Sequence, residues 1–257
     1  MCCRFVRQSR PETLAAQFGV DIAVMPFFAP SYNVAPQSTQ PVVRLNRDTG
    51  RHEFALMRWG LVPFWAKDAK IAYTTFNARA EEVRSKPAFR EAFKKRRCLI
   101  PADAFYEWQK LDAKTRQPWA IGLKSGDPCA FAGLWESWQT PNHGLSPVPT
   151  PAPALETFTI LTTGPNELMQ PIHNRMPVIL PAEDYTRWLG SDPDSTDNTR
   201  PLIDMLHPYP AERMRAWPVS SCVGNVRNND AALLNPAHPD PTSPQGSLFP
   251  AHGYPQC

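Results

Sequence analysis

The second residue of the chain offers the most distinctive chemistry. Cys2 directly follows Met1, so removal of Met1 would leave an α-amine and a thiol on adjacent carbons. An amine condenses with an aldehyde to a Schiff base, and a thiol beside that imine can close a five-membered thiazolidine ring. The ordinary pKa values are about 8 for the amine and about 8.5 for the thiol, so modest shifts make either group reactive at neutral pH. Cys2 is therefore a candidate nucleophile toward aldehydes.

The composition is that of a folded protein. The 257 residues are 42% hydrophobic and 20% charged, which is enough to build a core. The net charge of +3 is too small to indicate a polyanionic partner by itself. The six cysteines form no C-x-x-C pair and no zinc-like spacing, and no apolar run has the length of a signal sequence or membrane span. We expect a cytoplasmic protein without metal, cofactor or membrane contact, in which Cys2 remains a free thiol.

The pattern of apolar residues predicts an α+β fold, a strand-rich single domain with few short helices and long loops. Alternating and β-branched segments predict strands at residues 4–7, 41–45, 53–59, 97–101, 104–108, 119–123, 129–135, 158–163, 177–180 and 214–219. A Ser-Gly-Asp turn at 125–127 predicts that the strands on either side of it form a hairpin.

Helix signals occur at a few places. Ser9 and Glu12 have the spacing of a capping box, and Gly19 would end the helix that follows. Pro87 would lie in the first turn of a second helix, which opens at 85–87 and runs through Lys95. Shorter helices are predicted at residues 182–189 and 202–206.

Composition also predicts the domain limits. We expect one domain over residues 2–235, with an exposed proline-rich insertion at 139–155. Residues 236–257 are polar, small and rich in proline, which predicts a flexible tail.

Several short motifs together resemble those of the SOS-response-associated peptidase (SRAP) family, whose members are abasic-site processing proteins. They are MCCRF at 1–5, YNVAP at 32–36, RWGLVP at 58–63 with Trp65, FNARAE at 76–81, RCLIPAD at 97–103 running into FYEW at 105–108, IHNRMP at 172–177, and VS at 219–220 with VGNVRN at 223–228. The resemblance covers roughly residues 2–235. One position departs from the family pattern, because Cys3 stands where the family usually has glycine, which adds a side chain and a competing thiol.

The resemblance implies a covalent reaction with damaged DNA. Cys2, after removal of Met1, would bond to the C1′ aldehyde of an abasic site in single-stranded DNA through a Schiff base and then a thiazolidine. It also implies self-processing of Met1, as a peptidase-type hydrolase, and lyase or crosslink-release activity. The protein would be associated with the nucleoid when bound to DNA.

Three further catalytic residues follow from the resemblance. Asn77 would hold the substrate or the amine by hydrogen bonds. Glu107 would shuttle protons near Cys2, and His173 would assist opening of the sugar ring. By alternation alone, Glu107 shares a strand face with Phe105, and its carboxyl group is either partly buried with a raised pKa or exposed.

The expected DNA contacts are of two kinds. Cations close to the motifs could bind phosphates, and aromatic side chains could stack or wedge against bases. The predicted DNA-binding residues are Arg4, Asn33, Trp59, Trp65, Arg79 and Lys86, with Phe64 as a further stacking candidate. The segment Gln245–Phe249 resembles a sliding-clamp-binding peptide and makes a bacterial clamp a candidate partner of an otherwise monomeric protein.

Two alternatives remain open at this point. A conventional cysteine peptidase could use Cys2, His173 and Glu107 as nucleophile, base and orienting group. A passive single-strand binder would instead rely on its aromatic residues and arginines alone, and no covalent species would form.

Overall fold

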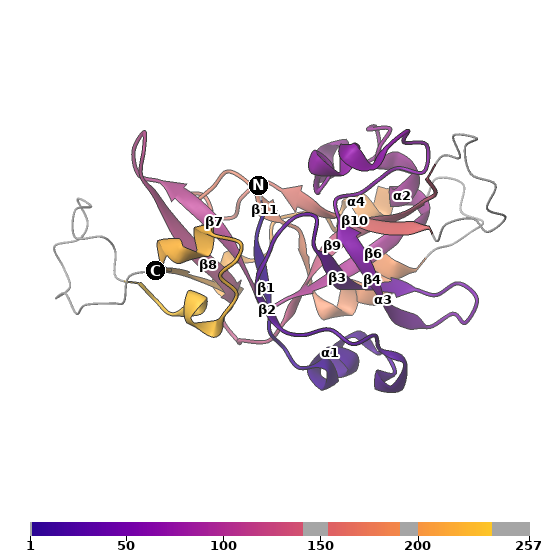
Figure 1. Ribbon diagram of the computed structural model, residues 1–257, viewed down its shortest axis with the longest axis horizontal. Helices are drawn as coiled ribbons and strands as arrows, with labels where there is room; N and C mark the ends of the chain where they lie inside the picture. The colour runs from indigo at the N-terminus through magenta and orange to yellow at the C-terminus, as the bar shows by residue number, and fades with distance from the viewer. Residues whose placement is uncertain (1, 141–153, 191–199, 238–257) are drawn as a thin grey trace.

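Two sheets that share a core make up most of the molecule. A computed structural model of the protein describes residues 2–140, 154–190 and 200–237 (Figure 1). The strands are β1 (Phe5–Arg7), β2 (Ser31–Val34), β3 (Thr39–Leu45), β4 (His52–Trp59), β5 (Asn77–Arg79), β6 (Arg97–Ala102), β7 (Ala104–Lys110), β8 (Arg116–Leu123), β9 (Cys129–Trp138), β10 (Leu155–Thr163), β11 (Met176–Pro177), β12 (Ile179–Leu180) and β13 (Met214–Pro218). The α-helices are α1 (Pro11–Phe18), α2 (Arg90–Lys95), α3 (Tyr185–Leu189) and α4 (Arg200–Ile203). The predicted strand-rich α+β fold is confirmed.

The larger sheet closes on itself. Its order runs from β10 through β4, β3 and β6 to β9, and β9 pairs again with β10, which gives a barrel-like ring. Closure satisfies the backbone groups that an open edge would leave unpaired. The same strand β10 also pairs in parallel with β5 and antiparallel with β11, so two short strands that flank the site are attached to it.

The smaller sheet has five strands in the order β13-β8-β7-β1-β2. Figure 1 shows β7 and β8 on one side of the molecule, the barrel on the other, and β1 and β2 between them. The two sheets are joined by a shared apolar cluster in which Phe5 and Phe105 of the smaller sheet each meet Phe131 of β9 edge to face, at centroid distances of 5.9 and 6.0 Å. This core holds the start of the chain in the junction between the sheets.

The first helix is present, but its predicted cap is wrong. α1 begins at Pro11, and the residue before it, Arg10, makes no side-chain capping bond. The Ser9 hydroxyl instead donates to Asp103, whose carboxylate also accepts from the Ser9 backbone N–H at 3.0 Å. A tertiary partner has therefore replaced the local cap. Gly19 ends the helix in the left-handed conformation, at φ 63°, as expected.

The second helix is shorter than predicted. α2 begins only at Arg90, and Pro87 lies in the turns that precede it. The Ser85 hydroxyl donates backward to the Glu82 carbonyl at 3.1 Å instead of capping a helix that runs forward. Residues 85–89 therefore form turns, because local side-chain bonds compete with the helix.

The predicted hairpin across residues 125–127 is also wrong. The turn exists, with Gly126 at φ 81°, and both flanking strands exist. However, β8 pairs with β7 and β13 in the smaller sheet, whereas β9 pairs with β6, β10 and β12 in the barrel. The turn therefore carries the chain from one sheet to the other. Apolar alternation identifies a strand but does not choose its partners.

The strands β2 and β5 were not predicted, and the other predicted elements agree with the structure within a few residues. The predicted helix at 182–189 is a 3-10 turn, Ala182–Asp184, followed by α3, and the one at 202–206 appears as α4, which starts and ends earlier. The domain limits 2–235 stay a prediction. Most of the 139–155 insertion and of the 236–257 tail lies outside the described residues, as does all of Gln245–Phe249.

Candidate active site

Cys2 lies at the junction of the two sheets, just before β1. Its side chain is fully buried, and its thiol is free. The Sγ atom lies 3.8 Å from the carbonyl oxygen of Arg4, to which it can donate. Burial raises the pKa of the Cys2 thiol well above its ordinary value, and the negative charge of Glu107 raises it further. The sulfur is therefore held as a neutral thiol.

Asn77 contacts Cys2 directly. Its Nδ2 donates to the Cys2 carbonyl oxygen at 2.6 Å. Its Oδ1 is buried and accepts no hydrogen bond from any residue that the structure describes. A buried acceptor without a partner costs free energy. The unpartnered Oδ1 atom beside Cys2 therefore favours a role in binding a ligand or the α-amine that removal of Met1 would free.

The position of Asn77 is set by the barrel. Asn77 begins β5 and pairs with Ile160 of β10. The indole N–H of Trp59 donates to the carbonyl of Phe76 at 2.7 Å, which fixes the residue before Asn77. Gly60 begins the loop between Trp59 and Asn77, and its backbone requires glycine. Its φ is 130°, and a Cβ there would lie 2.6 Å from the carbonyl oxygen of Ala72.

Glu107 supplies a buried carboxyl group from the other sheet. It lies on β7, and its side chain is only 3% exposed. Burial raises its pKa from the ordinary value of 4.5 to about 7, although the backbone N–H of Trp108 opposes the rise. Of the two readings that the sequence left open, the buried carboxyl is therefore correct. A group with a pKa near 7 can both accept and donate a proton at neutral pH.

His173 faces this carboxyl group across the junction. Its Nε2 lies 3.9 Å from Oε2 of Glu107, longer than a hydrogen bond. Nδ1 of His173 lies 3.1 Å from the backbone nitrogen of Arg175 and 3.2 Å from its carbonyl oxygen, so either neutral tautomer has a partner there. Partial burial lowers the pKa of His173, which favours the neutral imidazole.

The structure thus brings together the four predicted catalytic residues. Cys2 and Glu107 come from the smaller sheet, and Asn77 and His173 come from segments attached to the barrel. Cys3, the departure from the family pattern, is a half-buried free thiol whose pKa is raised by burial. Neither thiol has the depressed pKa of an activated thiolate.

Two of the predicted DNA-binding residues have structural partners. Arg4 Nη1 donates to Asn33 Oδ1 and to the carbonyl of Val223, both at 3.0 Å. Asn33 is buried, and its amide donates to the carbonyls of Val223, Asn225 and Asn228. The two side chains therefore bind the VGNVRN motif to β1 and β2, which explains these motif residues without DNA.

Trp59 is placed where no base can stack on it. Its side chain is fully buried, and its ring stacks on Phe158 at a centroid distance of 6.2 Å and an angle of 8°. The prediction of base stacking by Trp59 is therefore corrected: the residue anchors the segment before Asn77. Sequence alone could not separate a core tryptophan from an exposed one in the RWGLVP motif.

The remaining DNA candidates are accessible. Trp65 and Phe64 are 50% and 57% exposed, on the loop that follows β4. Arg79 and Lys86 are also more than half exposed, and both approach Glu82, at 3.7 and 3.2 Å. Exposed pairs of this kind are weak, so both cations can exchange Glu82 for a phosphate.

Arg175 is a polar residue near the site for which the sequence analysis gave no role. Its guanidinium binds both carboxylate oxygens of Glu81, at 2.7 and 2.9 Å, and the carbonyl of Thr162 at 2.5 Å. These bonds hold the segment of His173 to β10 and to the turn after β5. The sequence could have indicated this role, because Glu81 ends the FNARAE motif and Arg175 lies in the IHNRMP motif.

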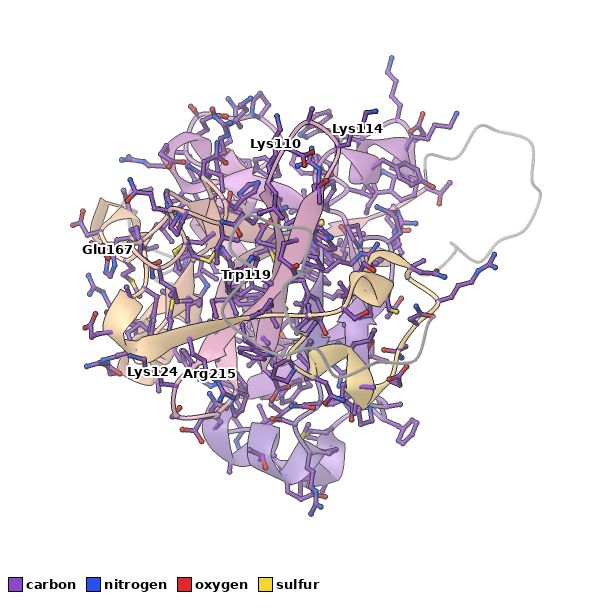
Figure 2. All side chains as sticks on the ribbon, turned by 90° about the vertical axis from the view of Figure 1, so that its left-hand side faces the viewer. Lys110, Lys114, Trp119, Lys124, Glu167 and Arg215 are labelled. Atoms are coloured by element: carbon purple, nitrogen blue, oxygen red, sulfur yellow. The ribbon has the colours of Figure 1, made fainter. Side chains whose placement is uncertain are left out.

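Gln109 and Trp119 were also missed. Trp119 stands directly opposite Glu107 in the β7–β8 ladder, and its indole N–H donates to Gln109 Oε1 at 3.0 Å. Figure 2 shows Trp119 near the middle of this side of the molecule, with Lys110 and Lys114 above it and Lys124 and Arg215 below. Neither residue lies in a quoted motif, and only the strand register places them beside the site.

Within the described residues, no group of three or more His, Cys, Asp or Glu side chains could hold a metal ion. No helix in the described ranges is both long and apolar enough to cross a membrane.

Comparison with known proteins identifies the family. The family model described as SOS response associated peptidase (SRAP) matches residues 1–226. The chain therefore belongs to the SRAP family, and the predicted family is confirmed.

Individual relatives agree. The chain is 45% identical over 236 residues to the abasic site processing protein YoqW of Bacillus subtilis, which covers 91% of this chain and 99% of YoqW. It is 32% identical to the abasic site processing protein HMCES of Xenopus tropicalis, over 79% of this chain and 64% of that protein. A crystal structure of a protein from Bacteroides thetaiotaomicron, 25% identical, has a TM-score of 0.76 and covers 92% of this chain and all of the other.

Proposed function

We propose that this protein processes abasic sites by forming a covalent thiazolidine link between Cys2 and the C1′ aldehyde of an abasic nucleotide in single-stranded DNA. The observation that carries the proposal is the meeting of Cys2, Asn77, Glu107 and His173 at one buried junction between the sheets. The named functions of the relatives, YoqW and HMCES, support the choice of substrate.

The reaction begins with removal of Met1, which frees the α-amine of Cys2. As the deoxyribose opens to the aldehyde, neutral His173 accepts the proton of the C1′ hydroxyl, and the imidazolium returns it to the ring oxygen, which leaves as a hydroxyl group. The amine then adds to C1′, and loss of one water gives the Schiff base. Glu107, with a pKa of about 7, takes the proton that the amine releases and returns it to the departing hydroxyl. The Asn77 Oδ1 acceptor orients the amine through its N–H.

Ring closure completes the link. The Cys2 sulfur adds to the imine carbon, a C–S bond forms, and the thiol proton ends on the nitrogen, so no atom is lost in this step. A neutral thiol suits this closure because the imine carbon is already electrophilic. Reversal of the same steps, with proton transfers through Glu107, would release the DNA, and elimination from the Schiff base would account for lyase activity.

Electrostatics disfavour the peptidase alternative for foreign proteins. A cysteine peptidase needs a thiolate beside a protonated imidazole. Burial here raises the pKa of Cys2 and lowers that of His173, which are both the opposite shifts. We therefore limit the proposed peptidase action to the release of Met1.

DNA would approach over exposed side chains that follow β4 and β5 in the chain. Arg79 and Lys86 supply phosphate contacts, and Trp65 with Phe64 supplies a surface for stacking, worth about 1–3 kcal/mol per base. Their exposure supports this assignment.

The test is a denaturing gel of purified protein incubated with single-stranded abasic DNA, together with the intact mass of the protein. We expect a processed N-terminus and a heat-stable adduct. Cys2→Ser should lose the heat-stable adduct, and the matched change Cys3→Ala should keep it. An adduct that survives in the Cys2→Ser variant, or a wild-type protein that retains Met1 and still reacts, would contradict the proposal.

A further inference from the structure

Gln109 links the two sheets beside the proposed catalytic residues. It lies two residues after Glu107 on β7, so both side chains project from the same face of the strand. Gln109 Nε2 donates to the carbonyl oxygen of Pro171 at 3.1 Å. Pro171 precedes His173 by two residues. One glutamine side chain therefore connects the strand of Glu107 to the segment of His173.

The other end of the Gln109 amide is also fixed. Its Oε1 accepts from the indole N–H of Trp119 at 3.0 Å, and Trp119 pairs across the ladder with Glu107. The bond determines which way the amide faces, because Oε1 must point to the indole and Nε2 is then aimed at Pro171. Trp119 thus orients the donor that Gln109 uses.

We propose that Gln109 is a positioning residue: it holds the segment carrying His173 against the strand carrying Glu107 and so sets the separation of these two side chains.

The geometry explains why such a link matters. Glu107 and His173 are separated by 3.9 Å between Oε2 and Nε2, so this contact is too long to act as a clamp by itself. Arg175 attaches the His173 segment to the barrel through Thr162 and Glu81. Gln109 supplies an attachment of the same segment to the other sheet. Together they fix it from both sides.

The experiment compares Gln109→Met with Gln117→Met. Methionine keeps the length and volume of glutamine and removes its hydrogen bonds. Gln117 stands directly opposite Gln109 on β8 and donates to the carbonyls of Pro118 and Val219, so it is a matched control that does not reach the His173 segment. Trp119→Phe is a third variant, which keeps an aromatic side chain of smaller size and removes the N–H that orients the amide.

The first readout needs no DNA. The imidazole of His173 is titrated by NMR in the full chain, with His173→Gln to assign its signal. In Gln109→Met the segment becomes more solvated, so we expect the pKa of His173 to rise toward its ordinary value, whereas Gln117→Met leaves it unchanged. Trp119→Phe should give a smaller shift in the same direction.

The second readout rests on the proposed function. At saturating abasic DNA, we expect Gln109→Met to slow crosslink formation by roughly tenfold to a hundredfold, with the affinity for DNA within about twofold of wild type. Identical His173 titrations in Gln109→Met, Gln117→Met and wild type would overturn the positioning role. If the wild-type protein forms no adduct, the proposed function fails, and the titration still decides the role of Gln109.

Discussion

Two buried glutamates, one on each sheet, have different surroundings. Glu107 and Glu136 are 3% and 4% exposed, and burial raises the pKa of both. Glu136, near the end of β9, has the guanidinium of Arg96 at 2.5 Å. Glu107 faces His173 at 3.9 Å, and partial burial favours the neutral form of that imidazole.

The comparison separates a structural carboxylate from the one to which we assign the proton transfers. At Glu136 the guanidinium of Arg96 opposes the rise in pKa that burial causes, and the side chain links the end of α2 and the loop after β4 to the barrel. At Glu107 the pKa of about 7 leaves the proton free to move at neutral pH. The properties of a buried glutamate therefore depend on the basic side chain beside it, which is Arg96 for Glu136 and His173 for Glu107.

The largest expected effect comes from removing the proton carrier. Glu107→Gln should slow crosslink formation by about a hundredfold or more, because general acid–base catalysis typically contributes that much. Glu136→Gln should stay within about twofold of wild type. Single-turnover crosslinking rates at pH 7 measure both. Equal losses in the two variants would remove the distinction between the glutamates.

Stability should change in the opposite direction to activity. The folded pKa of Glu107 is raised from 4.5 to about 7, so its favourable contribution is complete below the unfolded value and is lost as pH rises through the folded value. Gln does not titrate. Glu107→Gln should therefore be more stable than wild type at pH 8, by up to about 3 kcal/mol, relative to the difference at pH 4. Urea unfolding at both pH values checks this, and a difference that does not depend on pH would contradict the buried carboxyl.

The smallest effect concerns the structural glutamate. Arg96→Met removes the cation beside Glu136 and should lower the free energy of unfolding at pH 8 by about 1–3 kcal/mol, because a buried carboxylate loses its partner. Crosslinking should continue at the wild-type rate under conditions where the variant is folded. Thermal unfolding with the crosslinking assay tests both parts, and a selective loss of activity would connect this region to the site.

Much of the strand content was predictable from local patterns. The β-branched run at 158–163 and the alternation at 53–59 predict β10 and β4, and both are present. Partner choice was not predictable, as the turn at 125–127 shows, because alternation carries no information about which edge a strand will meet. The failed cap at Ser9 has the same origin, since Asp103, 94 residues away, supplied a stronger partner.

The residues of the candidate site were also predictable only in part. The motifs named Cys2, Asn77, Glu107 and His173, and the structure brings these four together. The motifs could not show that Trp59 is buried, or that Arg4 and Asn33 bind a loop of the protein itself. Gln109 and Trp119 escaped because their relevance depends on β-sheet register and on a contact to Pro171, which no local spacing encodes.

Strand β10 has a consequence for how the site can deform. Asn77 pairs with Ile160 of this strand, and Met176, three residues after His173, pairs with Thr163. Both are thus attached within roughly 10 Å along one strand, while Glu107 belongs to the other sheet. A shear between the sheets would change the distances of Asn77 and His173 from Glu107 together and leave their mutual spacing fixed. In such a shear, the β10 side of the site moves as one part against the strand of Glu107.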